Sequence, residues 1–233
     1  CGPTGKVTRH AKQTGFLRLS SGRNTLIMDC SAPIRPIPEN SASLGSFEVH
    51  LAGTPFIVNV GQLSEDRLLN EAFSQTAAHT ALTLDNLNNF CWKNKKYNPV
   101  KVLQIGPATG GMLVKLSHDG YGDSHGIIHD RQIYLTTGGG NLRGSDTLRY
   151  TGAPGEIPKT CIVRFHLHPR IRAATVSNGT VVLKISSQKA GWIFKCNGAN
   201  PVLEPSVYFE GKQRLSSQPV SYTHLRAHET LRY

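Results

Sequence analysis

Apolar and polar residues alternate from Cys161 to His168, with the period of two that is typical of a half-buried β-strand. In an extended chain one face carries the apolar side chains of Cys161, Val163, Phe165 and Leu167. Arg164, His166 and His168 share the other face, about 6.5–7 Å apart at each step. This row of basic side chains could meet a polyanion, bind a metal or face water, and the alternation by itself leaves the three open.

Short segments of this kind recur along the chain, separated by turns rich in Gly, Asn and Ser. Strands are predicted at residues 15–20, 25–30, 46–52, 55–60, 80–84, 100–105, 112–117, 127–136, 141–150, 159–168, 171–176, 180–186, 191–196 and 201–209. The one predicted helix is Ser64–Phe73, where Ser64 could cap the first turn and Leu68, Leu69 and Phe73 could pack. Many short strands without a strand–helix–strand rhythm predict an all-β fold, a large antiparallel β-sandwich.

Length and composition agree with one large globular domain of this class or with two small ones. The 233 residues are enough for a large β domain, and 38% of them are hydrophobic, which argues against disorder. No apolar run approaches the ~20 residues that a membrane-spanning helix needs. The five cysteines form no closely spaced pair, so we expect neither a disulfide framework nor a cysteine metal site.

The chain is basic, with a formal net charge of +11. Such an excess attracts nucleic acid, anionic lipid or acidic polysaccharide. The basic residues are scattered, however, and cluster only at Lys93–Lys96, without an RNA-binding aromatic motif, a zinc finger or a basic helix. Nucleic-acid binding is therefore disfavoured.

Further histidines stand near strand ends. His79 directly precedes the strand expected at 80–84, whereas His118 and His129 lie in neighbouring segments and His129 could be a surface residue of a hairpin. The pair His166 and His168 has a spacing that can ligate zinc, but a zinc site needs further ligands. We predict no bound metal and no cofactor.

Both ends of the chain depart from the strand pattern. Residues 219–233 resemble the translated sequencing-adapter read-through found at the ends of metagenomic reading frames, and we expect them to be a non-native tail. The chain opens at Cys1 without an initiator Met, so residues 1–14 are interpreted as a cut N-terminal segment. The expected domain is 15–218.

With these segments in place, the chain resembles the C-terminal β-sandwich domain of heparinase II/III-like proteins, over about residues 13–218. The motifs that carry the resemblance are the hairpin 15–29, Ser46–Val49, Ile57–Gly61, Ala78–Thr80, Leu82–Asp85, Ser117–Tyr121, His129–Tyr134, Leu142–Asp146, Arg164–Pro169 and Glu204–Tyr208. Each is short, and their number and common order make the resemblance specific.

The resemblance implies a larger protein in which an (α/α) toroid precedes the sandwich. Such enzymes are polysaccharide lyases that cleave uronic-acid-containing chains by β-elimination: a base takes the proton at C5, a polar group neutralises the carboxylate, and an acid protonates the leaving oxygen. Most of these groups belong to the toroid, so the fragment alone is expected to be inactive.

The sandwich of such lyases is expected to add a His-x-His-x-Asp segment, an Asp in the next strand and the His of an Ala-His-Asn-Thr motif, which together supply a catalytic His and a metal site. Here Glu39 and Ser41 stand at the two His positions, Asn59 at the Asp position, and only His79 is retained. Zinc needs three or four strong ligands, so we predict none here. His79 becomes the catalytic candidate, which either faces the toroid cleft or hydrogen-bonds a neighbouring loop.

Two functions follow from the resemblance. The first is the sandwich domain of a lyase acting on acidic polysaccharide, with Arg164, His166 and His168 as substrate-binding candidates and the toroid as partner. The second is a non-catalytic carbohydrate-binding or scaffolding domain of a degenerate relative, which the replaced histidines favour. The resemblance points to the cell envelope or periplasm.

Overall fold

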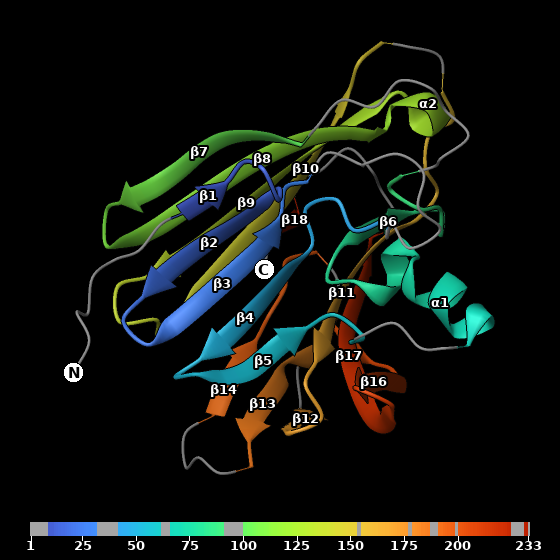
Figure 1. Ribbon diagram of the computed structural model, residues 1–233. Helices are drawn as coiled ribbons and strands as arrows, with labels where there is room; N and C mark the ends of the chain where they lie inside the picture. The colour runs from blue at the N-terminus through green and yellow to red at the C-terminus, as the bar shows by residue number, and fades with distance from the viewer. Residues whose placement is uncertain are drawn as a thin grey trace.

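The computed structural model describes residues 9–31, 42–61, 66–90, 100–152, 155–176, 179–186, 191–198, 200–224 and 231–232. Within these ranges antiparallel strands dominate, and they confirm the predicted all-β sandwich (Figure 1). No helix in the described part of the chain is long and apolar enough to span a bilayer.

Ten strands form the largest sheet. Its main path runs through β1 (Arg9–Ala11), β2 (Phe16–Ser21), β3 (Asn24–Asp29), β4 (Phe47–Leu51), β5 (Thr54–Val58), β11 (Cys161–Leu167), β17 (Gln213–His224) and β15 (Val202–Leu203). Two strands lie off this path: β6 (Leu82–Leu84) pairs with β11, and β16 (Ser206–Glu210) pairs with β17. Strand β11, which carries the candidate row, is therefore paired with three other strands.

Two smaller sheets complete the sandwich. The five-stranded sheet has the order β18 (Leu231–Arg232), β10 (Leu142–Tyr150), β9 (Ile127–Thr136), β8 (Gly111–Tyr121) and β7 (Lys101–Ala108). The three-stranded sheet has the order β12 (Ile171–Thr175), β13 (Val181–Ile185) and β14 (Gly191–Phe194). The short helical segments are α1 (Arg67–Phe73), the 3-10 turn η1 (Thr76–Ala78) and α2 (Gly122–His125).

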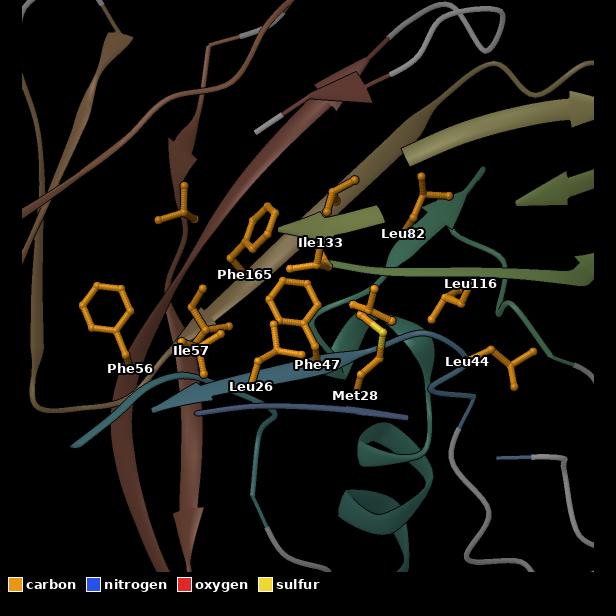
Figure 2. Packing of buried hydrophobic residues seen from close by; sticks show 14 of the residues in the cluster. Leu26, Met28, Leu44, Phe47, Phe56, Ile57, Leu82, Leu116, Ile133 and Phe165 are labelled. Carbon is orange, nitrogen blue, oxygen red and sulfur yellow. The ribbon is translucent and has the colours of Figure 1, made fainter. Parts of the chain in front are cut away.

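Apolar side chains from all three sheets meet in one core, as the alternation requires. Figure 2 shows Leu26, Phe47, Ile133 and Phe165 among its members, with Phe56 at one end of the row. The ring of Phe47 meets Phe165 edge to face at 6.2 Å between centroids. The core holds the large sheet against the five-stranded sheet and so fixes the polar residues between them.

The predicted helix is shorter than expected. Helix α1 begins at Arg67 because Asp66 caps it, its carboxylate accepting hydrogen bonds from the backbone N–H groups of Leu68 and Leu69. The cap expected at Ser64 lies outside the described residues. Phe73 is buried as predicted, whereas the side chain of Leu68 is 75% exposed, so its predicted packing is wrong.

The strand break expected after residue 218 is absent, because β17 continues to His224. Val220 and Tyr222 are fully buried and lie opposite Phe165 and Val163 of β11. Residues 219–224 are part of the large sheet and Leu231–Arg232 of the five-stranded sheet, although the interpretation of 219–233 as read-through stays a prediction. The predicted strand 201–209 is in fact two short strands, β15 and β16.

Candidate functional site

The catalytic candidate His79 is a buried residue at the end of η1. Its backbone N–H donates to the carbonyl of Thr76, and its own extended conformation leads the chain away from the turn. His79 is only 9% exposed, and neither ring nitrogen has a hydrogen-bond partner among the described residues. Burial lowers the pKa of His79 to about 4, against a smaller opposing effect of the Phe73 backbone, so the ring is neutral at pH 7.

His166 lies at the same turn. Its Nε2 donates to the carbonyl oxygen of Ala77 at 2.9 Å, which leaves Nδ1 unprotonated and without a partner in the described structure. Burial lowers its pKa to about 4, and the neighbouring His79 and Arg164 act in the same direction. The structure therefore brings together His79 and His166, which the sequence placed in separate candidate groups.

The other two members of the row are also engaged. The ring of His168 packs edge-on against Tyr208 at 5.0 Å, its Nδ1 accepts from the Arg170 backbone N–H at 3.3 Å, and burial lowers its pKa. Arg164 is half-buried, with Nε 3.7 Å from a carboxylate oxygen of Glu204.

The row is thus not the cationic outer face that its spacing indicated. The side chains of His166 and His168 are 5% and 6% exposed. Their face of β11 is covered by η1, which contacts His166, and by β16, whose Tyr208 contacts His168. Both imidazoles are neutral at pH 7, and the one cation of the row is paired with Glu204. Whether these side chains contact a substrate stays a prediction.

The residues at the family's catalytic and metal positions divide into two groups. Glu39, at the catalytic His position, and Ser41, at a metal-ligand position, lie outside the described residues. Asn59 is fully engaged as a structural link: its backbone N–H and Nδ2 both donate to Glu48, at 3.2 and 3.1 Å, and its Oδ1 accepts from the Thr80 backbone at 3.0 Å. In the described part of the chain no group of three or more His, Cys, Asp or Glu side chains is arranged to hold a metal ion.

A buried polar chain links two histidines to an aspartate between the sheets. A bulge between His118 and Tyr121 lets the Gly120 backbone N–H donate to His118 Nδ1 at 3.2 Å. His118 Nε2 must then carry the proton and donate to His129 Nδ1 at 2.8 Å, and His129 Nε2 donates in turn to Asp146 at 2.7 Å. The backbone donor therefore fixes both tautomers.

Arg131 closes this chain at its other end. Its guanidinium donates two hydrogen bonds to Asp146, at 2.7 and 2.9 Å, and both side chains are fully buried. Burial alone would raise the pKa of Asp146, but Arg131 and His129 hold it well below its usual range. Burial lowers the pKa of His118 strongly, and the neighbouring His129 and Arg131 act in the same direction.

The same guanidinium reaches the candidate site. Arg131 Nη1 donates to the carbonyl of Thr80, next to His79, and to that of Gly45, both at 2.9 Å. The central carbon of the Arg131 guanidinium also lies 5.6 Å from the centre of the Phe47 ring. Arg131 thus ties the residue after His79 to the turn that precedes β4.

The sequence contained a signal for this network. In β9 every second residue from Ile127 to Leu135 is buried, and His129 and Arg131 share that parity with three apolar residues. Of the alternatives left open for His129, the surface position on a hairpin is wrong, since the residue is 1% exposed. A basic residue in phase with an apolar row indicates a paired, buried position.

Comparisons with known proteins give one family match, one relative of partial length and solved structures of similar fold. The family described as "Heparinase II/III-like, C-terminal" matches residues 3–230. FtsZ-localized protein C of Caulobacter vibrioides is 27% identical over 93% of this chain and 41% of its own length. A solved heparinase III is 15% identical with a TM-score of 0.73, and a heparan sulfate lyase HepC mutant from Pedobacter heparinus is 13% identical with a TM-score of 0.72. Each covers 97% of this chain, which spans 35% of that protein.

Proposed function

We propose, on the premise that this chain belongs to the heparinase II/III-like C-terminal family, that it is the β-sandwich domain of a protein that cleaves acidic polysaccharide by β-elimination. The substrate class is a uronic-acid-containing chain. Because the chain spans well under half of the relatives it matches, the activity belongs to a larger protein that contains the toroid.

The observation that carries this proposal is the state of His79. Its two ring nitrogens are buried and make no hydrogen bond of normal geometry in the described structure, where the ring has only a minor interaction with the Phe73 backbone, and buried polar groups are nearly always paired. A toroid packed over η1 would supply those partners, or place the ring beside the reacting sugar. A neutral imidazole there has the free lone pair that proton abstraction requires.

Arg164 is the proposed contact for a substrate carboxylate. A guanidinium can bind a carboxylate through two parallel hydrogen bonds, and Glu204, at 3.7 Å, is a long and partly exposed partner that a substrate could displace. His166 and His168 are neutral, so their proposed part in substrate binding is hydrogen bonding rather than charge pairing.

The complete reading frame tests this proposal. The full-length protein should release unsaturated uronate products, seen by their ultraviolet absorbance, from at least one acidic polysaccharide, whereas the present domain alone should release none. His79→Gln in the full-length protein should lower the rate of product release without changing the unfolding temperature. A folded full-length protein that binds and cleaves no polyuronate or sulfated glycan would contradict the proposal.

A second candidate is a non-catalytic carbohydrate-binding or scaffolding domain. It is favoured by Asn59, whose amide is occupied by Glu48 and Thr80, and by the Glu and Ser at positions 39 and 41. The relative from Caulobacter carries a name that refers to localisation with FtsZ and to no enzymatic activity. Glycan binding by the full-length protein without product release would select this candidate.

The remaining parts of the proposal concern the setting. We propose that the parent protein acts in the cell envelope or periplasm, where it would encounter extracellular polysaccharide. Its partners are the glycan and its own toroid. Fractionation of cells that express the complete protein tests the location directly.

A further inference from the structure

A cavity of about 350 Å³ lies where the large sheet, the three-stranded sheet and the beginning of β10 in the five-stranded sheet meet, apart from the residues around η1. Phe56 and Phe165 line it from the large sheet, and Trp192 and Phe194 line it from β14. These rings meet across the two sheets, with Phe56 and Trp192 5.6 Å apart and Phe165 and Phe194 5.0 Å apart between centroids. The cavity is thus lined largely by aromatic rings and is partly open to the surface.

Positive charge borders this apolar lining. All the lining residues are apolar except Asn141, Arg143 and Lys195, and none of them is acidic. Arg143 and Lys195 are exposed, and neither forms an ion pair within the described structure. An apolar group that carries a negative charge beside it matches both features.

The backbone of β14 provides a third feature. β14 is the last strand of its sheet and pairs only with β13 among the strands that the structure describes. The cavity is lined by side chains from both faces of this strand: the inward Trp192 and Phe194 and the outward Ile193 and Lys195. It therefore opens along the edge of the strand. Unpaired N–H and C=O groups at such an edge are a template for another extended chain.

The three features together select one kind of ligand. A sugar would need a wall of hydrogen-bonding side chains for its hydroxyl groups, and the lining offers few. An acyl chain would use the apolar gap and the cations but not the strand edge. An extended peptide uses all three, because its backbone pairs with β14 while alternate side chains point toward the cavity.

We propose that the cavity and the free edge of β14 form a docking site for an acidic, extended peptide segment of a partner protein. An aromatic or branched apolar side chain of that segment occupies the cavity, and its flanking carboxylates lie beside Arg143 and Lys195. The exposed side chain of Ile193, at 66%, lies on the same strand and is covered when the segment binds. This site requires neither lyase activity nor the toroid.

The test uses the whole chain and a synthetic peptide of about six residues, the usual length of a strand, with a central Phe among Asp residues. Trp192 reports binding by its fluorescence once the other tryptophan, Trp92, is replaced by Phe. We expect saturable binding that weakens with salt, and loss of binding when the peptide Phe is replaced by Ser or the Asp residues by Lys.

Matched charge variants locate the site. Arg143→Glu with Lys195→Glu should weaken peptide binding about tenfold or more. Arg172→Glu with Lys184→Glu makes the same charge change on an exposed cross-strand pair of the small sheet outside the cavity lining, and should leave binding unchanged. Both variants should unfold at the temperature of the parent protein, because all four side chains are exposed.

Several results would overturn the docking site. They are an absence of peptide binding, an equal loss of binding in the two double variants, and indifference to the central Phe. Tighter binding of a uronic-acid oligosaccharide, or of vesicles that contain an anionic phospholipid, with the same dependence on Arg143 and Lys195 would assign the cavity to that ligand instead.

Discussion

His129 Nε2 donates a 2.7 Å hydrogen bond to Asp146, and both side chains are closed off from solvent between the two large layers of the sandwich. The carboxylate also accepts two hydrogen bonds from the buried Arg131, so one anion accepts three hydrogen bonds from two side chains. The stability of the domain should depend on that anion more than on any ion pair at its surface.

Asp146→Asn tests this dependence. Loss of the carboxylate leaves the Arg131 charge buried with a neutral partner, and breaking a buried pair from one side costs about 3–5 kcal/mol. The matched control is Asp130→Asn, which breaks the partly exposed pair with Arg149 on the same two strands and should cost about 0–1 kcal/mol. Denaturant unfolding of the two variants measures both values, and similar costs would show that burial does not set the strength of the network.

A second prediction concerns the proton positions in the polar chain. Because His118 Nδ1 accepts from the Gly120 backbone, His118 should carry its proton on Nε2, and so should His129. Long-range nitrogen–proton NMR correlations at neutral pH distinguish the two tautomers of each ring. A proton on Nδ1 of His118 would mean that the direction of the chain is wrong.

The buried imidazole of His166 predicts a loss of stability in mild acid. Its pKa is about 4 in the folded state and about 6.5 when unfolded, so the unfolded chain binds the extra proton first as the pH falls. Stability should therefore decrease from pH 6.5 to pH 4, by up to roughly 3 kcal/mol for this group, and not further below pH 4 through it. Because His79 has a similarly lowered pKa, His166→Gln should reduce that slope without abolishing it in urea unfolding followed across the range, and an unchanged slope would contradict the assignment.

Arg164 provides a test of the substrate contact in the full-length protein. Arg164→Ala should weaken binding of an acidic polysaccharide by about 1–3 kcal/mol if the guanidinium pairs with a carboxylate. Glu204→Gln removes the internal competitor for the same guanidinium and should not weaken binding. Binding isotherms for both variants decide the point, and unchanged affinity in a folded Arg164→Ala protein would remove Arg164 from the substrate site.

The predicted lack of a zinc site can be tested by rebuilding it. The present chain should not bind zinc tightly at micromolar metal, because Asn59 and Ser41 are poor ligands beside His79. The double variant Ser41→His and Asn59→Asp, together with the retained His79, restores the family's metal-ligand types and should gain affinity for zinc. Calorimetric titration compares the two proteins, and strong zinc binding by the unaltered chain would refute the prediction.

The sequence predicted the strands well because a period of two depends only on neighbouring residues. Ile127–Thr136 matches β9 at both ends, and most other predicted strands differ from the observed ones by a few residues. The predicted strands end at residue 209, so they do not include β17, although Val220 and Tyr222 keep the alternation; the resemblance of 219–233 to read-through predicts no strand there.

The candidate site was less predictable, since its environment comes from distant parts of the chain. The alternation around Phe165 correctly placed Arg164 and His166 on the face opposite the apolar core residues. It could not predict that the carbonyl of Ala77 and the ring of Tyr208 contact that face and bury its histidines. Which face of a strand is polar follows from local sequence, whereas what covers that face does not.

The hydrogen bonds of Arg131 have a consequence for the order in which the domain folds. They reach carbonyls 86 and 51 residues earlier in the chain, so the guanidinium finds these acceptors only after two long loops have closed. Until then its charge opposes collapse of the apolar residues around it. The strands can form hairpins early, but the two sheets should close late and in one cooperative step, which makes slow, all-or-none folding the expected behaviour of this sandwich.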